Sequence, residues 1–211
     1  EPVPAAGMTF INTFIEAQEV AYRIDRNFIQ DAFNPLPYRS YGFGLLYARE
    51  NRRLEAFSSY QEARIIDTTF TVRDSVFYSS IVYGTHDDPR HFVTEDRIPA
   101  GTQNPQEIAA VRFYNLANLP KRATLYIGDL ETPAAFRNRP LETPASGKAG
   151  EAFIPIQPGD YTLTVVDEDG ATIAIRSGIS LPKGSYTSIF LTGDEREPST
   201  YYVGVVYQRV N

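Results

Sequence analysis

The sequence predicts an all-β protein made of two tandem antiparallel β-sandwich domains that arose by internal duplication. Short runs that alternate apolar with polar residues, rich in Thr, Val, Ile, Tyr and Phe, recur along the 211 residues. Turn residues separate these runs at intervals of about 8 to 12 residues, as in sandwiches. The second half of the chain repeats the pattern of the first, and helical periodicity is confined to about one turn within residues 104–111.

About seven strands are expected in each half. In the first half they are Met8–Phe14, Glu19–Ile24, Tyr41–Ala48, Arg53–Ser59, Arg64–Val72, Ser75–Tyr83 and Phe92–Ile98. In the second half they are Ala110–Asn115, Ala123–Ile127, Glu151–Pro155, Tyr161–Asp167, Thr172–Ser177, Ser185–Thr192 and Tyr201–Val210. Each half is expected to form one immunoglobulin-like or prealbumin-like sandwich.

The repeat is clearest in two segments that lie 109 residues apart. VRDSVFYSSIVYGT at residues 72–85 matches LPKGSYTSIFLTGD at residues 181–194. Phe77 then stands opposite Tyr186. Any two β-rich segments align loosely, but here the inward-facing positions keep the same parity, which favours duplication.

The offset between the halves changes slowly along the chain. Phe10 matches Phe113 at an offset of 103, whereas Phe92 matches Tyr202 at 110. Loop insertions after a duplication would produce such a drift, and the main insertion is expected within residues 129–151.

These patterns predict four parts of the chain. Residues 1–7 form an N-terminal spacer, and residues 8–98 form the first sandwich, the more divergent repeat. Residues 99–109, rich in Pro, Gly and polar residues, form a linker, and residues 110–211 form the second sandwich.

Composition excludes several classes of function. The net charge of −6 offers no basic surface for nucleic acid. The chain has no Cys, so disulfides and thiolate chemistry are excluded. No apolar run approaches the roughly 20 residues of a transmembrane helix. The opening EPVPAAG is expected to be a spacer left after processing, and a lipid anchor upstream of Glu1 is compatible with it.

Three segments of the second half carry a resemblance to a known family. They are VRFYNLANLPKRATLYIGD, FIPIQPGDYTLTVVD and ISLPKGSYTSIFLTGD. The pattern resembles the bacterial extracytoplasmic domain-of-unknown-function family 4397 (DUF4397), well over residues 110–193 and more weakly over residues 8–85. The resemblance implies a surface lipoprotein in the periplasm or on the outer cell surface, with a role in cell adhesion. It implies no catalytic residues.

Two acidic segments could hold a metal ion, but simpler interpretations are favoured. His86 and His91 flank Asp87 and Asp88, the right ligands for zinc, yet their spacing fits no known site and the segment is expected to be a polar loop. Residues 167–170, Asp-Glu-Asp-Gly, could bind calcium, but Asp-Gly between two alternating runs predicts a hairpin turn. No metal and no cofactor are therefore predicted.

No sequence signature of catalysis is present. The chain lacks Gly-x-Ser-x-Gly, and both of its His residues lie in one segment. It has no glycine-rich phosphate-binding loop, and Gly42-Phe43-Gly44 is expected to be a bulge in a strand. A pair of carboxylates that meets only in space stays open as a third hypothesis. The protein is predicted not to be an enzyme.

Tyrosines are the other candidates for ligand contact. The chain has 14 Tyr and no Trp. Most rings are expected in the core or at its rim, with the hydroxyl at the surface. The tyrosines that could instead form a stacking platform for sugars are Tyr38, Tyr41, Tyr47, Tyr60, Tyr201 and Tyr202.

The long connection at residues 129–150 is the predicted partner contact, because loops on a rigid scaffold carry most binding residues. The residues singled out are Phe136, Arg137, Arg139 and Lys148 within it, and the pair Tyr201 and Tyr202. The leading hypothesis is a non-enzymatic scaffold or binding module of the cell envelope, with adhesion as a candidate role and a protein or glycan as partner. The alternative is a carbohydrate-binding module for glycan capture.

Overall fold

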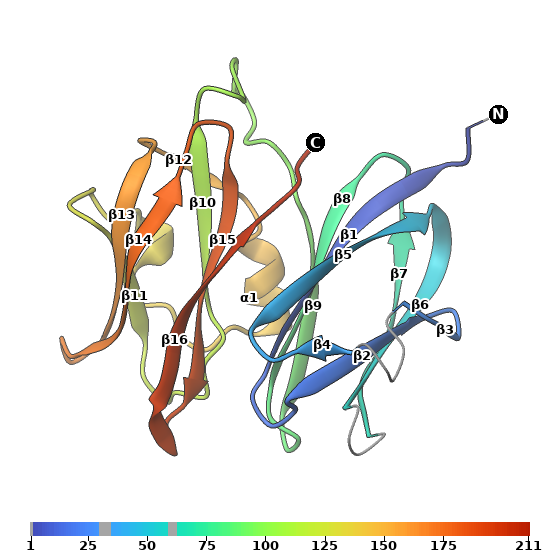
Figure 1. The fold of residues 1–211 in the computed structure, drawn as a ribbon, viewed down its shortest axis with the longest axis horizontal. Coiled ribbons are helices and arrows are strands. Elements are labelled where there is room, and N and C mark those ends of the chain that lie inside the picture. Colours follow the sequence, from blue (N-terminus) through green and yellow to red (C-terminus); the bar gives the residue numbers. More distant parts are fainter. Residues whose placement is uncertain (1, 30–34, 59–62) are drawn as a thin grey trace. The chain divides into compact units, whose positions relative to one another are not determined.

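The computed structural model describes residues 2–29, 35–58 and 63–211 (Figure 1). Their regular structure is almost entirely β-strand, which confirms the predicted all-β class. The chain divides into two compact units. The first runs to Asp96 and includes Asn211, and the second covers Arg97–Val210. Each unit is a sandwich of two sheets.

In the first unit one sheet has the strand order β5-β1-β8-β9 and the other β3-β2-β6-β7, with the short β4 paired to β2. The bounds are β1 Ala5–Phe14, β2 Glu19–Ile24, β3 Asn27–Phe28, β4 Leu36–Pro37, β5 Ser40–Tyr47, β6 Arg49–Ser58, β7 Arg64–Val72, β8 Phe77–Gly84 and β9 Pro89–Glu95.

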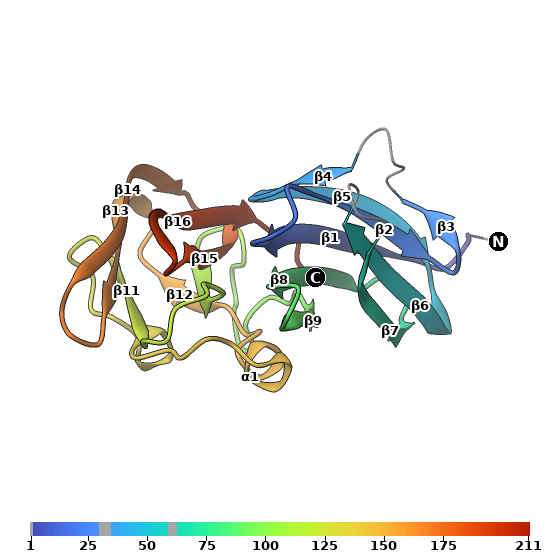
Figure 2. The same ribbon diagram turned by 90° about the horizontal axis from the view of Figure 1, so that it is seen from below.

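The second unit repeats this arrangement, with sheets β12-β10-β15-β16 and β11-β13-β14 (Figure 2). The bounds are β10 Ala109–Asn115, β11 Ala123–Ile127, β12 Ile154–Ile156, β13 Gly159–Asp167, β14 Thr172–Leu181, β15 Tyr186–Asp194 and β16 Glu197–Tyr207. A 3₁₀ turn, η1 (Ala134–Phe136), and a short helix, α1 (Pro144–Ala149), lie between β11 and β12.

Among the described residues, each unit has one parallel pair of strands, so its sheets are not purely antiparallel as expected. β1 pairs in parallel with β8, and β10 with β15. Parallel neighbours cannot be joined by a tight hairpin. Here most of the unit's strands lie between the two partners in sequence. In an immunoglobulin constant domain the first two strands share a sheet, whereas here they lie in different sheets.

The strand register confirms the duplication. Gly7 lies opposite Phe77 in the first unit, and Ala110 lies opposite Tyr186 in the second, which reproduces the offsets of 103 and 109. The pairs Ile24↔Leu54 and Ile127↔Leu163 keep the same two offsets.

The offset expected for the last strand was wrong by two residues. Ser80 pairs with Val93, whereas Ile189 pairs with Val205, so the structural offset is 112 rather than 110. The β15–β16 hairpin is longer and has a register shift after Thr192. A two-residue slip keeps every side chain on its own face, so alternation alone does not reveal it.

The insertion is also narrower than expected. Val20 pairs with Leu36 in the first unit, and Ala123 forms the matching bridge with Arg139, so the offset of 103 persists well past residue 129. The additional residues therefore lie between residues 142 and 154, where α1 forms.

Alternate residues of the facing sheets form the main core of each unit, and Ala110, Phe153 and Tyr186 form a smaller cluster in the second unit. In the first unit the fully buried members include Met8, Tyr22 and Leu54, and in the second Val111, Leu125 and Leu163. Core members recur at every second residue of their strands, while β1, β8, β10 and β15 are buried at nearly every position.

A buried asparagine stands at the same place in both units. The Nδ2 group of Asn12 donates to the Leu36 carbonyl at 3.0 Å, and its Oδ1 accepts the Phe14 N–H at 3.0 Å. The Arg39 N–H completes the set by donating to the Asn12 carbonyl at 2.8 Å. Because Leu36 pairs with β2, this asparagine bridge joins the two sheets of the sandwich.

Asn115 forms the same bridge in the second unit. Its Nδ2 donates to the Arg139 carbonyl at 3.0 Å, and its Oδ1 accepts the Ala117 N–H at 3.3 Å. The Glu142 N–H donates to the Asn115 carbonyl at 2.9 Å. Both asparagines are completely buried, so these bonds have no competition from water.

We predict that Asn12→Ala and Asn115→Ala each destabilise the protein by about 3 kcal/mol, because each leaves a buried N–H and a buried carbonyl without their side-chain partner. Urea denaturation measures the loss. Asn104→Ala, at an exposed position, is the control and is expected to change stability by less than about 0.5 kcal/mol. Equal, small effects for all three variants would contradict a structural role for the bridge.

Candidate functional site

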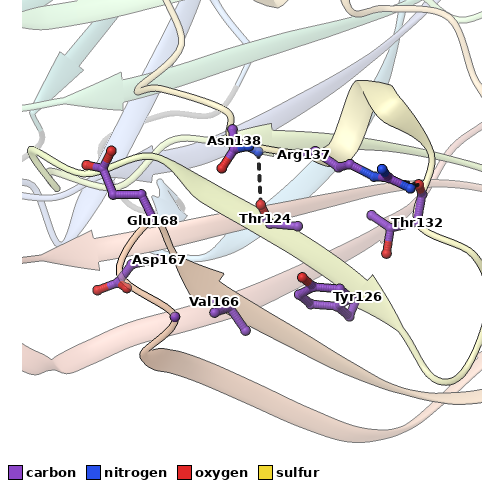
Figure 3. A pocket seen from close by; sticks show the side chains of 9 residues that line it. Thr124, Tyr126, Thr132, Arg137, Asn138, Val166, Asp167 and Glu168 are labelled. Carbon is purple, nitrogen blue, oxygen red and sulfur yellow. Dashed lines mark hydrogen bonds between the residues drawn. The ribbon is translucent and has the colours of Figure 1, made fainter.

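A polar hollow lies on the outer face of the second unit's three-stranded sheet (Figure 3). Its volume is about 360 Å³. Residues from three separate segments line it, namely Thr124, Tyr126, Thr132, Arg137, Asn138, Val166, Asp167, Glu168 and Gly170.

Alternation along β11 supplies the floor of the hollow. Leu125 points into the core and is fully buried, so Thr124 and Tyr126 on either side of it point outward. Val166 of β13 pairs with Thr124 and continues the floor. Tyr126 is 43% exposed, so its side chain is open to solvent on this face.

The turn from Asp167 to Gly170 forms one wall and confirms the hairpin predicted for it. Oδ1 of Asp167 accepts the N–H groups of Asp169 at 2.9 Å and Ala171 at 3.0 Å. Gly170 has φ +84°, a left-handed conformation that favours glycine. Lys121 pairs with Asp169 at 2.7 Å and lies 3.5 Å from Asp167.

These bonds keep Asp167 ionised. Burial by itself would raise the pKa of its carboxyl, but the N–H groups of Ala171 and Asp169 and the ammonium of Lys121 outweigh burial and lower the pKa. The carboxylate is therefore already occupied by the chain's own donors.

The segment before residue 139 forms the opposite wall. Arg137 folds back and donates from Nε (2.9 Å) and Nη2 (2.6 Å) to the Thr132 carbonyl. The N–H of Asn138, which has φ +49°, donates to the Thr124 hydroxyl at 2.9 Å. Figure 3 shows Asn138 and Arg137 along this side and Asp167 and Glu168 at another, with β11 between them.

A buried ionic cluster holds this wall in place. Arg139 exchanges two backbone hydrogen bonds with Ala123, at 2.8 and 2.9 Å. Its guanidinium pairs with Glu142, which is completely buried. Glu142 also accepts the Ser146 hydroxyl at 2.9 Å and the Asn115 N–H at 3.1 Å. The wall is thus formed before any ligand arrives.

Chemically the hollow combines an aromatic ring with donors and acceptors of mixed charge. Arg137 and Asn138 are donors, whereas Glu168 and the threonine hydroxyls are acceptors. This combination suits a ligand with hydroxyl groups and an apolar face.

The predicted contact residues of the long connection lie in different environments. Arg137 lines the hollow. Phe136 is 1% exposed and packs edge to face on Phe113, so its ring belongs to the core. Arg139 is paired with Glu142, and Lys148 with Glu151 at 2.8 Å.

Tyr201 and Tyr202 do not line the hollow. Tyr201 packs partly buried against the core of the second unit. The ring of Tyr202 lies 5.1 Å from the guanidinium of Arg176.

The two histidines lie in different surroundings rather than in one loop. β9 begins at Pro89, so His91 lies in a strand, with Nε2 2.7 Å from the Ser80 hydroxyl. Burial lowers the pKa of His91 to about 4, so it is neutral at pH 7. His86 packs edge to face on Phe14. Within the described ranges, no three His, Asp or Glu side chains gather as metal ligands.

Two of the suggested platform tyrosines lie together on the edge strand β5. Phe43 and Leu45 lie between Tyr41 and Tyr47 at every second position. Four exposed apolar side chains therefore share one face of this strand. Tyr60 lies outside the described residues.

Sequence reasoning missed Tyr126 and Thr124, and it considered Glu168 only as a calcium ligand. The available signal was the alternation of apolar and other residues along 123–127. Leu125 and Ile127 are buried on either side of Tyr126, so its side chain points outward.

No family model matches the chain, and no curated protein matches it. Among solved structures, the chain is similar to CBMbc, a module of family CBM26 from Eubacterium rectale Amy13K, crystallised in complex with maltoheptaose. The two are 9% identical, the match covers 97% of each chain, and the TM-score is 0.28. Similarity at this level carries no argument about ligand or fold. In the part of the chain that the structure describes, no helix has the length and apolar character of a membrane span.

We predict that Asp167→Asn destabilises the protein by about 1 kcal/mol at pH 7, because it removes the charge that two N–H groups and Lys121 stabilise. The pKa of Asp167 is lowered in the folded state, so its contribution is complete above its ordinary value of 3.8 and is lost as the pH falls through the lower, folded-state value. Urea denaturation of both proteins between pH 7 and pH 2 measures this. The stability difference should shrink below about pH 4, and a difference that stays constant would contradict the assignment.

Proposed function

We propose that this protein is a non-catalytic binding module of the bacterial cell envelope, and that the hollow beside Tyr126 takes uncharged sugar units. One observation carries the proposal: an exposed aromatic ring lies between donors and acceptors that the fold already holds in place. A sugar presents C–H groups on its ring face and hydroxyls at its rim. The Tyr126 ring suits the face, and Arg137, Asn138 and Glu168 suit the rim.

Rigidity supports this function. One wall is tied to β11 by the bond from the Asn138 N–H to the Thr124 hydroxyl and by the backbone bonds between Arg139 and Ala123. The other wall is held by the bonds of its own turn to Asp167. Little conformational entropy is then lost on binding, which favours affinity even for a shallow site.

The carboxylates of the hollow do not suit glycoside hydrolysis. Hydrolases need two carboxyl groups that face the bond to be cleaved. Of the two that line the hollow, Asp167 is occupied by the N–H groups of its own turn and by Lys121. Glu168 is left without a second reactive carboxylate, so capture rather than cleavage fits the geometry.

The resemblance to family 4397 supports the envelope location and a lipid anchor. The proposed function therefore includes a location in the envelope and a lipid anchor. The precursor sequence tests them, because a lipobox cysteine upstream of Glu1 is required for such an anchor.

Adhesion through protein contact is the second candidate function. The stripe of Tyr41, Phe43, Leu45 and Tyr47 on β5 favours it, because exposed apolar patches on a sheet edge commonly mark contact surfaces.

For the leading candidate, we predict that Tyr126→Ala weakens binding of the best uncharged glycan found on a glycan microarray at least tenfold, since it removes the stacking surface. Isothermal titration calorimetry measures the affinity. Tyr207→Ala is the matched control, because Tyr207 is exposed to a similar extent, 46%, and lies outside the hollow. Equal affinities for the two variants would place the site elsewhere, and an array without any uncharged ligand would refute the proposed function.

For adhesion, we predict that Tyr47→Lys abolishes attachment of protein-coated beads to cells and leaves glycan binding unchanged. Tyr47 is 68% exposed, so the charge disrupts a contact and not the core. Protease treatment of the cells should have the same effect if the partner is a protein. Attachment that survives both treatments would exclude this surface.

A further inference from the structure

The hollow continues into a row of side chains that crosses the outer face of the sheet. Tyr126 of β11 pairs with Thr164 of β13, and Thr164 pairs with Ile175 of β14. Directly paired residues point to the same face. Ile175 is 61% exposed, so the row begins with an exposed ring at the hollow and ends with an exposed aliphatic side chain.

The first unit has a corresponding row of different chemistry. Arg23 pairs with Glu55, and Glu55 pairs with Asp67, at the same positions of the matching strands. Arg23 Nε donates to Glu55 Oε2 at 2.8 Å. The guanidinium of Arg23 also lies 5.6 Å from the ring of Phe28 and 4.8 Å from that of Phe57.

Further ion pairs complete the row of the first unit. Asp67 accepts from Arg53 at 2.7 Å and from Arg64 at 2.6 Å. The hydrogen bond from Arg23 is the main cause that holds the pKa of Glu55 below its usual value. This surface satisfies its own charges and offers few free polar groups to a ligand.

The second unit carries no charge along the same row. Thr164 takes the place of Glu55, and Ile175 takes the place of Asp67. Beside the row, the hydroxyls of Thr162 and Ser177 lie 3.4 Å apart and are also uncharged. One copy of the fold thus has an ionic face, and the other has an open face of hydroxyl and apolar groups.

We propose that the ligand of the hollow is a linear, uncharged oligosaccharide that runs from the hollow across the three strands, with one sugar unit over each of Tyr126, Thr164 and Ile175. This inference rests on the function proposed above. Adjacent strands lie about 4.8 Å apart, which is close to the length that one sugar unit adds to an extended chain. The row therefore matches such a chain in spacing, in its lack of charge and in its mixture of hydroxyl and apolar groups.

A peptide fits this surface less well. An extended peptide pairs along the edge of a sheet through its backbone, whereas the row runs perpendicular to the strands and presents side chains only.

The test is the dependence of affinity on chain length. Cello-, malto- and β-1,3-gluco-oligosaccharides of two to six units are titrated calorimetrically into the full chain. In the series that binds, affinity should rise at least tenfold from the disaccharide to the trisaccharide and then level off, because the row offers three positions, one on each strand.

Variants separate the row from the hollow. Ile175→Glu should weaken tetrasaccharide binding at least tenfold and leave the disaccharide unaffected. Tyr126→Ala should weaken both. Leu45→Glu is the matched control, since it places the same charge at an exposed apolar position of the other unit, and it should change neither. Ile175 is exposed, so thermal unfolding should show all of these proteins folded.

The outcomes distinguish the two proposals. Two results together would overturn the extended row and leave the hollow as a sugar site. The disaccharide and the tetrasaccharide would bind with equal affinity, and Ile175→Glu would bind both as tightly as the unchanged protein does. The absence of binding in all three series and on the microarray would overturn both.

Discussion

The asparagine bridge is the constraint on which both sandwiches depend. Asn12 lies two residues before the end of β1, and Asn115 ends β10. Each of these strands pairs in parallel with its unit's penultimate strand, and each asparagine bonds to a segment that pairs with the opposite sheet. A buried amide at this place satisfies backbone groups that water cannot reach. In the second unit the same bridge places Arg139 beside Ala123, and so fixes the wall from which Arg137 and Asn138 reach the hollow.

Duplication explains why the two units share a frame and differ in surface chemistry. Core positions must stay apolar and on the same face of each strand, so they preserve the register between copies. Outward positions carry no such constraint. There the first unit has the ion-paired row of Arg23, Glu55 and Asp67, and the second has Tyr126 and its uncharged neighbours. Function is therefore expected where the copies diverge on a face that the common frame holds rigid.

The insertion contributes to the site indirectly. Helix α1 begins with a capping box in which Thr143 and Ser146 bond to each other's backbone N–H groups. Ser146 also donates to the buried Glu142, which pairs with Arg139. The added residues lie away from the hollow, yet they complete the cluster that anchors its wall. Removal of a buried ion-pair partner is costly, so this cluster stabilises one arrangement of the wall.

The sequence by itself determined the long strands and the duplication, because alternation and turn residues are local and are repeated 103 and 109 residues apart. It also predicted the hairpin at residues 167–170, whose Asp-Gly signal is local. It did not predict the short strands β3 and β4 or the helix α1, which depend on packing against the rest of the unit. Only the tertiary structure decided which candidates face a ligand. Phe136 and Arg137 are neighbours in the chain, but the 3₁₀ turn sends one into the core and the other to the hollow. Tyr126, Arg137 and Glu168 come from three distant segments, which strand pairing brings to one place. No local sequence pattern predicts that they lie close together.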